Sequence, residues 1–248
     1  MNRPPTHRFL HASIIVLGAL GVLALAGAPL SAAALGRDSL LFAWTDGARS
    51  TLAAASIVMV VAFVAGILAG TSAALGPSFA DTSLAFSMEI AGALPSFAAV
   101  LVVRAISPTS ELMAVAVVLA VLRGLATGKV VRAELRRLEA AEFVLSARAL
   151  GSSKARLFRR HLFPHVAGPV LADAAHAAAA VVALDTALSL AGLGTGERTW
   201  GSLFARAVES ASVGVALVPA LGLGATIAAL LVVAQALENG WRVGRRFV

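Results

Sequence analysis

Four ionisable side chains lie inside stretches of this chain that are otherwise apolar, and they are the first candidates for chemistry. They are Glu89, Asp173, His176 and Asp185. Ionisable residues in membrane-length apolar segments are costly, so they usually face a polar path or one another. The three carboxylates are therefore candidates for lining a translocation path that favours cationic groups. The alternative is hydrogen bonding between helices, for example between Asp173 and His176 one turn later.

The composition predicts that membrane-spanning helices position these residues. Of the 248 residues, 59% are hydrophobic and only 13% are charged, whereas about a quarter of the residues in soluble domains are charged. Several windows of about 18 to 22 residues carry few or no charges, which is enough to cross a hydrocarbon core of about 30 Å. We therefore predict a single all-α, polytopic membrane domain over residues 1–248.

Six candidate spans follow from the apolar runs, and Pro and Gly residues mark several of their ends. The spans cover residues 9–28, 49–75, 83–106, 111–128, 166–190 and 213–237. The first run also has features of a cleaved secretory signal peptide. We expect it to be retained as a span, because its apolar stretch is longer than most signal-peptide cores.

The distribution of Lys and Arg predicts the orientation. Basic residues gather at the N-terminus, in the segment 129–160 and at residues 242–246, whereas the opposite side holds four. These four are Arg37, Arg49, Arg198 and Arg206. The positive-inside rule places the first set, and with it both termini, in the cytoplasm. The segment 76–82 is also placed there, although it carries no Lys or Arg. Because insertion explains the net charge of +7, we expect a lipid bilayer and no nucleic acid as partner.

The longest polar segment covers residues 129–165 and separates the fourth span from the fifth. Its pattern predicts a helix over 131–150, a break at 151–153 and a second short helix that ends at Pro164. Its large apolar residues include Leu150, Leu157, Phe158 and Phe163. Such side chains are unusual in a loop that contacts only water. We therefore predict a helical hairpin that a groove on another protein grips, with a solvated loop as the alternative.

Several segments share their order and spacing with one family of membrane proteins. They are S-A-R-A-L-G-S-S-K-A-R-L-F-R-R-H-L-F-P-H at 146–165, A-L-P-S-F at 93–97, A-L-S-L-A-G-L-G at 187–194 and T-W-G-S-L at 199–203. In these segments the chain resembles the permease subunits of ATP-binding-cassette importers, most closely the second permease of the dipeptide, oligopeptide and nickel uptake branch. The family's counterparts are its E-A-A loop, A-F-P-S-L, S-L-S-F-L-G-L-G and S-W-G-S-M.

The resemblance implies that the hairpin is the contact with an ATPase subunit and that residues 49–237 form the core permease fold. The implied coupling positions are Glu142, Leu145, Ser146, Ala147, Ala149, Gly151, Ser152, Arg156, Leu157, Phe158, His161 and Pro164. The family's E-A-A falls on Leu145-Ser146-Ala147, so its acidic residue is absent and Glu142 is the nearest substitute. Leu157 and Phe158 are expected to fill the partner's groove. The arginines would pair with acidic residues of the ATPase or with lipid headgroups.

The resemblance also implies partners and a location. A second, homologous permease would complete the translocation pathway, and an extracytoplasmic substrate-binding protein would deliver the substrate. Two ATP-binding subunits would hold ATP and Mg, so this chain is expected to bind no cofactor or metal and to have no catalytic residue. The implied location is the bacterial plasma (inner) membrane. Peptides are the expected substrate class, with nickel complexes as another possible cargo. Trp200 is expected to begin a short outer helix near the binding protein, or to act as an interfacial aromatic anchor.

The sequence argues against two enzyme classes and is compatible with two further kinds of membrane protein. A P-loop ATPase is excluded because G-L-A-T-G-K at 124–129 is one residue too short and is followed by Val130. An intramembrane hydrolase would need a Ser beside a base or a pair of Asp, and neither is evident. A secondary transporter that relays ions through the intramembrane carboxylates is the main competing hypothesis, and a purely structural subunit is the second. Neither of these needs the hairpin.

Overall fold

The computed structural model describes residues 14–22, 27, 39–107, 112–194 and 198–244, and within them the chain is helical without strands. This confirms the predicted all-α fold. Four helices are long and apolar enough to cross a membrane, and a bent pair of helices is a fifth candidate. Half of the predicted first span, 9–28, lies outside the described residues, and residues 14–22 are helical.

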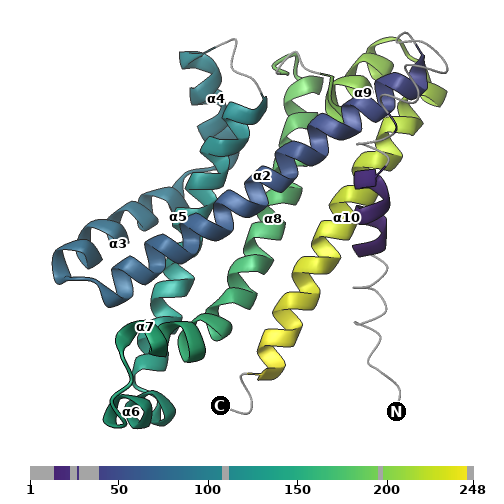
Figure 1. The fold of residues 1–248 in the computed structure, drawn as a ribbon. Helices are drawn as coiled ribbons and strands as arrows, with labels where there is room; N and C mark the ends of the chain where they lie inside the picture. Colours follow the sequence, from purple (N-terminus) through teal and green to yellow (C-terminus); the bar gives the residue numbers. More distant parts are fainter. Residues whose placement is uncertain (1–13, 23–26, 28–38, 108–111, 195–197, 245–248) are drawn as a thin grey trace, which may run out of the picture.

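The long helices form an inclined bundle (Figure 1). They are α2 (Leu40–Leu75), α5 (Leu112–Glu139), α8 (Phe163–Leu190) and α10 (Val213–Gly244). The shorter elements are α3 (Ser78–Ala93), α4 (Ser96–Ile106), α6 (Glu142–Ala149), α7 (Lys154–Leu157), the π-helical segment η1 (Phe158–Leu162) and α9 (Trp200–Glu209). In Figure 1, α6 and α7 lie at the same end of the bundle as the last turns of α10, and α9 lies at the opposite end.

The predicted span 83–106 is not one continuous helix. It is divided between α3 and α4, which meet at an angle of 93°. Pro95 has no N–H to continue α3, and it holds Leu94 in the extended region at φ −74° and ψ 121°. Pro95 then serves as the N-cap residue of α4. The same proline therefore ends one helix and begins the next.

Helices α2 and α5 approach closely through small residues on both sides. A Cβ atom on Gly70 would lie 2.6 Å from the carbonyl oxygen of Gly128, and one on Gly124 would lie 2.9 Å from that of Ala62. Side chains larger than hydrogen therefore do not fit at these positions, as is common where membrane helices pack. Gly66 lies on the same face, where an added Cβ would be 3.3 Å from the carbonyl oxygen of Gly124. The P-loop-like glycines serve the same packing.

Two large apolar clusters fill the bundle. One includes residues of α2, α5, α8, α9 and α10 and contains Trp200. The other lies where α5 and α8 meet α6 and α7, and its buried members are Val131, Leu135, Leu138, Val144, Leu157, Leu162, Val166 and Val170. We call this second set the root cluster. Because it joins two spanning helices to the two short helices, those short helices pack against the bundle and are not a free loop.

Candidate functional site

The α6–α7 hairpin, residues 142–157, turns at the glycine that the sequence indicated. Gly151 has a φ of +79°, a left-handed conformation that favours glycine. The N–H of Ser152 donates to the carbonyl of Ala147 at 3.1 Å, which closes the end of α6. The Ser153 hydroxyl accepts from the N–H of Arg156 at 3.4 Å. The predicted break at 151–153 is therefore confirmed.

The predicted helix over 131–150 is wrong in one respect, because it is broken between α5 and α6. The N–H of Ala141 donates to the carbonyl of Leu138 at 3.0 Å, which tightens the last turn of α5. After this turn, Val144 is fully buried in the root cluster beside Leu138. No Gly or Pro marks the break in the sequence. Burial of Val144 is the physical reason for the turn, since tertiary packing overrides local helix propensity.

The second helix of the hairpin does not end at Pro164, contrary to the sequence-based prediction. Helical structure runs without interruption from Lys154 to Leu190, through η1. In η1 the N–H of Phe163 donates to the carbonyl of Phe158, five residues earlier. A wider π turn fits a proline at 164, which has no N–H and whose ring would clash with a carbonyl in a regular α-helix. The hairpin is thus directly continuous with the spanning helix α8.

The expected coupling residues divide into a buried and an exposed set. Leu157 is only 3% exposed and packs in the root cluster, so the expectation that it fills a groove on another protein is wrong. Phe158 is partly buried, with its ring centroid 6.0 Å from that of Phe163. Leu145 and Leu150 are 52% and 87% exposed.

The remaining expected coupling positions mostly face outward. The exposed ones are Glu142, Ser146, Ala149, Gly151, Arg156 and Pro164. Ala147 and Ser152 are partly buried. The side chain of His161 lies outside what the structure describes. The hairpin thus presents apolar and charged groups on its surface while the root cluster holds its inner side.

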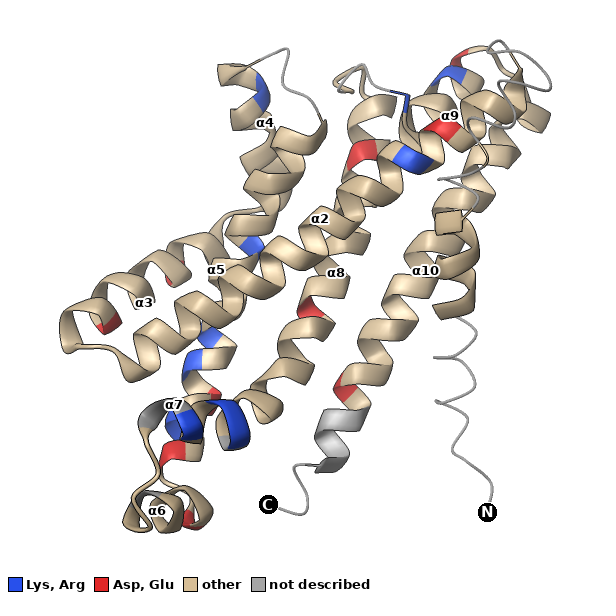
Figure 2. Cartoon of the chain, in the orientation of Figure 1, with Lys and Arg blue, Asp and Glu red and all other residues tan. Residues whose placement is uncertain are grey.

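Ion pairs brace the same end of the molecule, where Lys and Arg gather around α7 and the adjoining turns of α5 (Figure 2). Arg132 Nε lies 2.6 Å from Asp81 Oδ1, and Arg136 Nη2 lies 2.5 Å from Asp81 Oδ2. Asp81 belongs to the first turn of α3. The segment 76–82 has no Lys or Arg, but through Asp81 it is held beside the arginines of α5. The segment therefore lies on the hairpin's side of the bundle.

The three candidate path carboxylates have different environments. Glu89 is exposed on α3, and Lys129 Nζ donates to its Oε2 at 2.7 Å. Asp185 is only 4% exposed, at the opposite end of the bundle from the hairpin. A Cβ atom on Gly201 would lie 2.7 Å from Asp185 Oδ2, so this carboxylate packs directly against the start of α9. Neither Glu89 nor Asp185 contacts Asp173, and the structure therefore does not gather the three carboxylates into one site.

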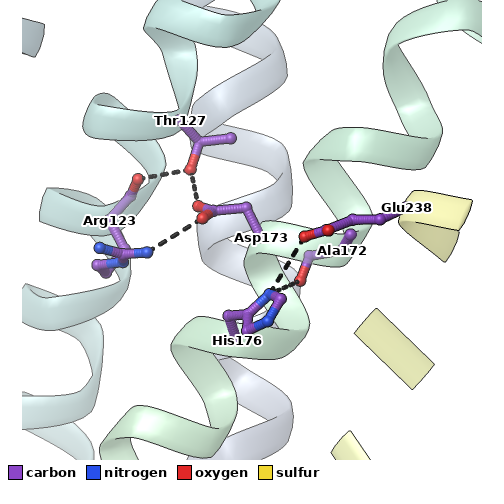
Figure 3. Close-up of polar contacts among 6 residues, drawn as sticks. All are labelled: Arg123, Thr127, Ala172, Asp173, His176 and Glu238. Carbon is purple, nitrogen blue, oxygen red and sulfur yellow. Dashed lines mark hydrogen bonds and ion pairs between the residues drawn. The ribbon is translucent and has the colours of Figure 1, made fainter. Parts of the chain in front are cut away.

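Asp173 lies in a group of charges that the sequence analysis did not assemble (Figure 3). Arg123 Nη2 donates to Asp173 Oδ1 at 3.0 Å, and the hydroxyl of Thr127 donates to Asp173 Oδ2. His176 Nδ1 lies 3.0 Å from the carbonyl oxygen of Ala172 and 3.9 Å from Glu238 Oε1. The contact between Asp173 and His176, which was the example given for the alternative, is not formed. Each side chain instead faces a different neighbouring helix.

These charges line an open cavity of about 400 Å³ between α5, α8 and α10. Its walls include Arg123, Thr127, Asp173 and Glu238. An isolated charge at the centre of a bilayer costs about 2.5–3.5 kcal/mol on insertion scales, so the Arg123–Asp173 pair reduces the cost of placing both. A volume of this size is typical of small-molecule sites.

Arg123, Thr127 and Glu238 were not identified from the sequence. Arg123 is the only Lys or Arg in residues 112–128, and that isolation within an apolar run was the available signal. Glu238 lies one residue past the predicted last span, where an acidic residue is unremarkable. Only the packing of α10 beside α8 brings it to the cavity.

At the opposite end, Trp200 begins α9, as expected, but it is not an interfacial anchor because its side chain is fully buried. Its indole N–H donates to the carbonyl of Trp44 at 3.0 Å, and its backbone N–H donates to the Thr51 hydroxyl at 3.1 Å. Thr199 and Ser202 form a capping box at the start of α9. Trp200 therefore joins α9 to α2.

Comparison with known proteins identifies the family of this chain. Residues 62–242 match the family described as binding-protein-dependent transport system inner membrane component. The chain is 31% identical over 180 residues to a Brucella ovis protein named as a peptide permease, an alignment covering 71% of this chain and 59% of the relative. Two proteins named oligopeptide transport system permease protein OppC also match. The Bacillus subtilis protein is 23% identical over 68% of this chain and 55% of its own length. The Mycobacterium bovis protein is 27% identical over 65% and 55%. This chain therefore spans between 55% and 59% of the lengths of these relatives.

Proposed function

This chain belongs to the family of binding-protein-dependent transport system inner membrane components, and we propose that it is the transmembrane permease subunit of an ATP-driven importer of peptides. Peptides are the substrate class because the similar proteins of Brucella ovis and Bacillus subtilis are named for peptide and oligopeptide transport. In this proposal the chain forms half of the translocation pathway and couples closure of the ATPases to alternating access.

The observation that carries the proposal is the rooted hairpin. Leu145 and Leu150 are largely exposed at the surface of α6 and the turn that follows, while Val144 and Leu157 hold the same elements to the bundle from inside. Large apolar side chains displayed on a rigid, charged surface are typical of a protein–protein contact. A groove on a cytosolic ATPase is the proposed partner surface.

The helical continuity of α7, η1 and α8 supports a mechanical role for this contact. A force applied at α7 reaches α8 through an unbroken helix, and a force applied at α6 reaches it through the root cluster that α5 shares. Packed helices move as rigid bodies between discrete arrangements. Closure of the ATPase pair would therefore shift α8 relative to its neighbours and switch the pathway between inward and outward access.

The proposed assembly contains this chain, a homologous second permease, two ATP-binding subunits and an extracytoplasmic substrate-binding protein. ATP and Mg belong to the ATP-binding subunits. The proposed location is the bacterial plasma membrane, with the hairpin and both termini in the cytoplasm and α9 outside. Of the candidate path residues, Asp173 is assigned to the pathway because it borders a cavity. The burial of Asp185 against α9 supports a structural role for that residue.

Site-specific cross-linking tests the coupling contact. The chain has no Cys, so Leu150→Cys introduces a single thiol at the exposed turn. In membranes that contain the co-expressed complex, a short bifunctional cross-linker should join this position to an ATP-binding subunit. The matched control is Ser210→Cys, which is also exposed but lies at the end of α9. Capture of the ATP-binding subunit by both positions, or by neither, would contradict the proposal.

The energy source of uptake distinguishes the proposed importer from an ion-coupled carrier. Uptake of a labelled peptide should stop when ATP is depleted and continue when an uncoupler removes the proton gradient. An ion-coupled carrier would give the reverse result.

A further inference from the structure

The cavity between α5, α8 and α10 places opposite charges on facing walls. Arg123 projects from α5, and Glu238 projects from α10 on the other side of α8, which contributes Asp173 between them (Figure 3). The cavity holds about 400 Å³ and is open. Its volume lies in the range of about 300–1,000 Å³ that small-molecule sites occupy. The coupling mechanism described above makes no use of these charges.

Arg123 has hydrogen-bonding capacity that its contacts in the structure do not use. A guanidinium has five N–H donors in a planar fork that matches a carboxylate. One Nη donates to Asp173. The Nε is buried, but the side chain is 39% exposed, so its terminal N–H groups can be reached from the cavity. Asp173 and the Thr127 hydroxyl that donates to it fix the orientation of the guanidinium. Arg123 is thus positioned to bind a second anion.

The wall formed by α8 and α10 has the opposite character. Asp173 and Glu238 both contribute carboxylates to the cavity. His176 lies beside Glu238, with its Nδ1 3.9 Å from Glu238 Oε1. An incoming molecule with one carboxylate and one ammonium group would match this arrangement, with its carboxylate at Arg123 and its ammonium at Glu238.

We propose that this cavity binds a small zwitterion, a short peptide with free amino and carboxyl ends, through Arg123 and Glu238. Asp173 and Thr127 are positioning residues that hold Arg123. This inference rests on the proposed function and adds to it a recognition site within the permease. It predicts that the permease itself discriminates between free and blocked peptide ends.

A phosphatidylethanolamine headgroup carries the same chemistry, because it also joins an ammonium to an anionic group. The test therefore uses the full chain in nanodiscs of phosphatidylcholine, whose quaternary ammonium has no N–H to donate. The probe is labelled dialanine. The competitors are dialanine amide, N-acetyl-dialanine and soluble glycerophosphoethanolamine.

The expected result is that each blocked peptide competes about tenfold less well than dialanine, because it lacks one charge-assisted contact. Arg123→Gln should remove the preference for the free carboxylate and keep the preference for the free amine. Glu238→Gln should do the opposite. This crossed pattern distinguishes recognition from general loss of structure, since a misfolded variant would lose both preferences together.

Three outcomes would overturn the inference. Equal competition by free and blocked peptides would show that the ends are not read. Retention of both preferences in both variants would place the site elsewhere. Displacement by glycerophosphoethanolamine at lower concentrations than dialanine would make the cavity a lipid site. Arg123→Lys, which keeps the charge but loses the fork, provides a second variant if Arg123→Gln does not fold, and it should weaken the carboxylate preference.

Different results would contradict the proposed function and the proposed recognition site. If ATP-dependent peptide uptake occurs in the assembled complex but the crossed pattern is absent, only the recognition site is wrong. If the crossed pattern is present but uptake does not depend on ATP, the site stands and the importer assignment is wrong.

Discussion

The two ends of the molecule use large apolar side chains in opposite ways. At the end with α9, Trp200 is fully buried, and both its N–H groups donate to atoms of α2. At the end with the α6–α7 hairpin, Leu150 is 87% exposed and Leu145 is 52% exposed. Both ends are nevertheless packed, since the root cluster holds the hairpin as the larger cluster holds α9.

The difference supports the proposed contact of another protein with the hairpin. Side chains that are turned inward stabilise this chain by themselves. Exposed leucines on a firmly held hairpin contribute little to the fold of this chain, so their apolar surface is available to another protein. Substitutions at the α9 end should therefore reduce folding stability, whereas substitutions at the hairpin surface should reduce transport without a loss of folded protein.

The largest expected effect is that of Trp200→Ala. Truncating a fully buried Trp that packs against Trp44, with ring centroids 5.3 Å apart, should cost about 3–5 kcal/mol of unfolding free energy. Thermal unfolding of the purified chain in detergent should show the loss, and uptake should fall only in proportion to folded protein. Unchanged stability would show that α9 does not depend on Trp200.

Gly201→Ala should destabilise the α9 end by a smaller amount, about 1–3 kcal/mol, through overpacking. The added Cβ would lie 2.7 Å from Asp185 Oδ2 and 2.8 Å from Thr186 Cα. Gly214→Ala is the matched control, since a Cβ there meets no described atom within 4 Å. The same unfolding assay should show the loss only for Gly201→Ala. Equal stability of the two variants would mean that the close approach is relaxed in solution.

Leu150→Glu tests the hairpin end. Because the side chain is exposed, folded yield and thermal stability should not change. A charge in the proposed partner groove should lower ATP-dependent uptake about tenfold, equivalent to about 1.4 kcal/mol. Leu150→Met keeps an apolar side chain and should retain uptake. Normal uptake by the Glu variant would argue that this surface meets only water.

The smallest expected effect is that of replacing one glycine with alanine at each end of the molecule. Gly151 and Gly192 have φ values of +79° and +71°, and an added Cβ at either position meets no described atom within 4 Å. Alanine at each position should therefore cost about 1 kcal/mol of backbone strain. The two stabilities should fall alike, while uptake per folded molecule should fall only for Gly151→Ala. Equal uptake by both variants would show that the geometry of the hairpin turn is not used in coupling.

The sequence predicted the parts of the fold that depend on local chemistry. Apolar length indicated the spanning segments, and Gly151 marked the hairpin turn because few other residues adopt its φ. Two features depended on tertiary packing and were not predicted. The break before α6 has no Gly or Pro and follows from the burial of Val144. The proline at 164 was expected to end a helix, whereas η1 accommodates it.

The candidate sites were predictable to different degrees. The hairpin is contiguous in sequence, so its position and exposed residues could be found there. The cavity combines residues separated by 115 positions, from Arg123 to Glu238, and no local pattern links them. Asp173 was identified but was assigned the wrong neighbour. Residues i and i+3 on a helix can meet, yet α8 packs between two helices that each offer a better partner.

The π turn at residues 158–162 also sets the direction in which the hairpin points. An α-helix rotates by about 100° per residue. Deleting one residue there and restoring regular α-helix would therefore swing residues 142–157 about the axis of α8 by roughly that angle. The fourth and fifth spans would keep their sequences, but Leu150 would lie in a different direction around the axis of α8. The single extra residue of the π turn thus sets the rotation of the hairpin relative to the membrane helices.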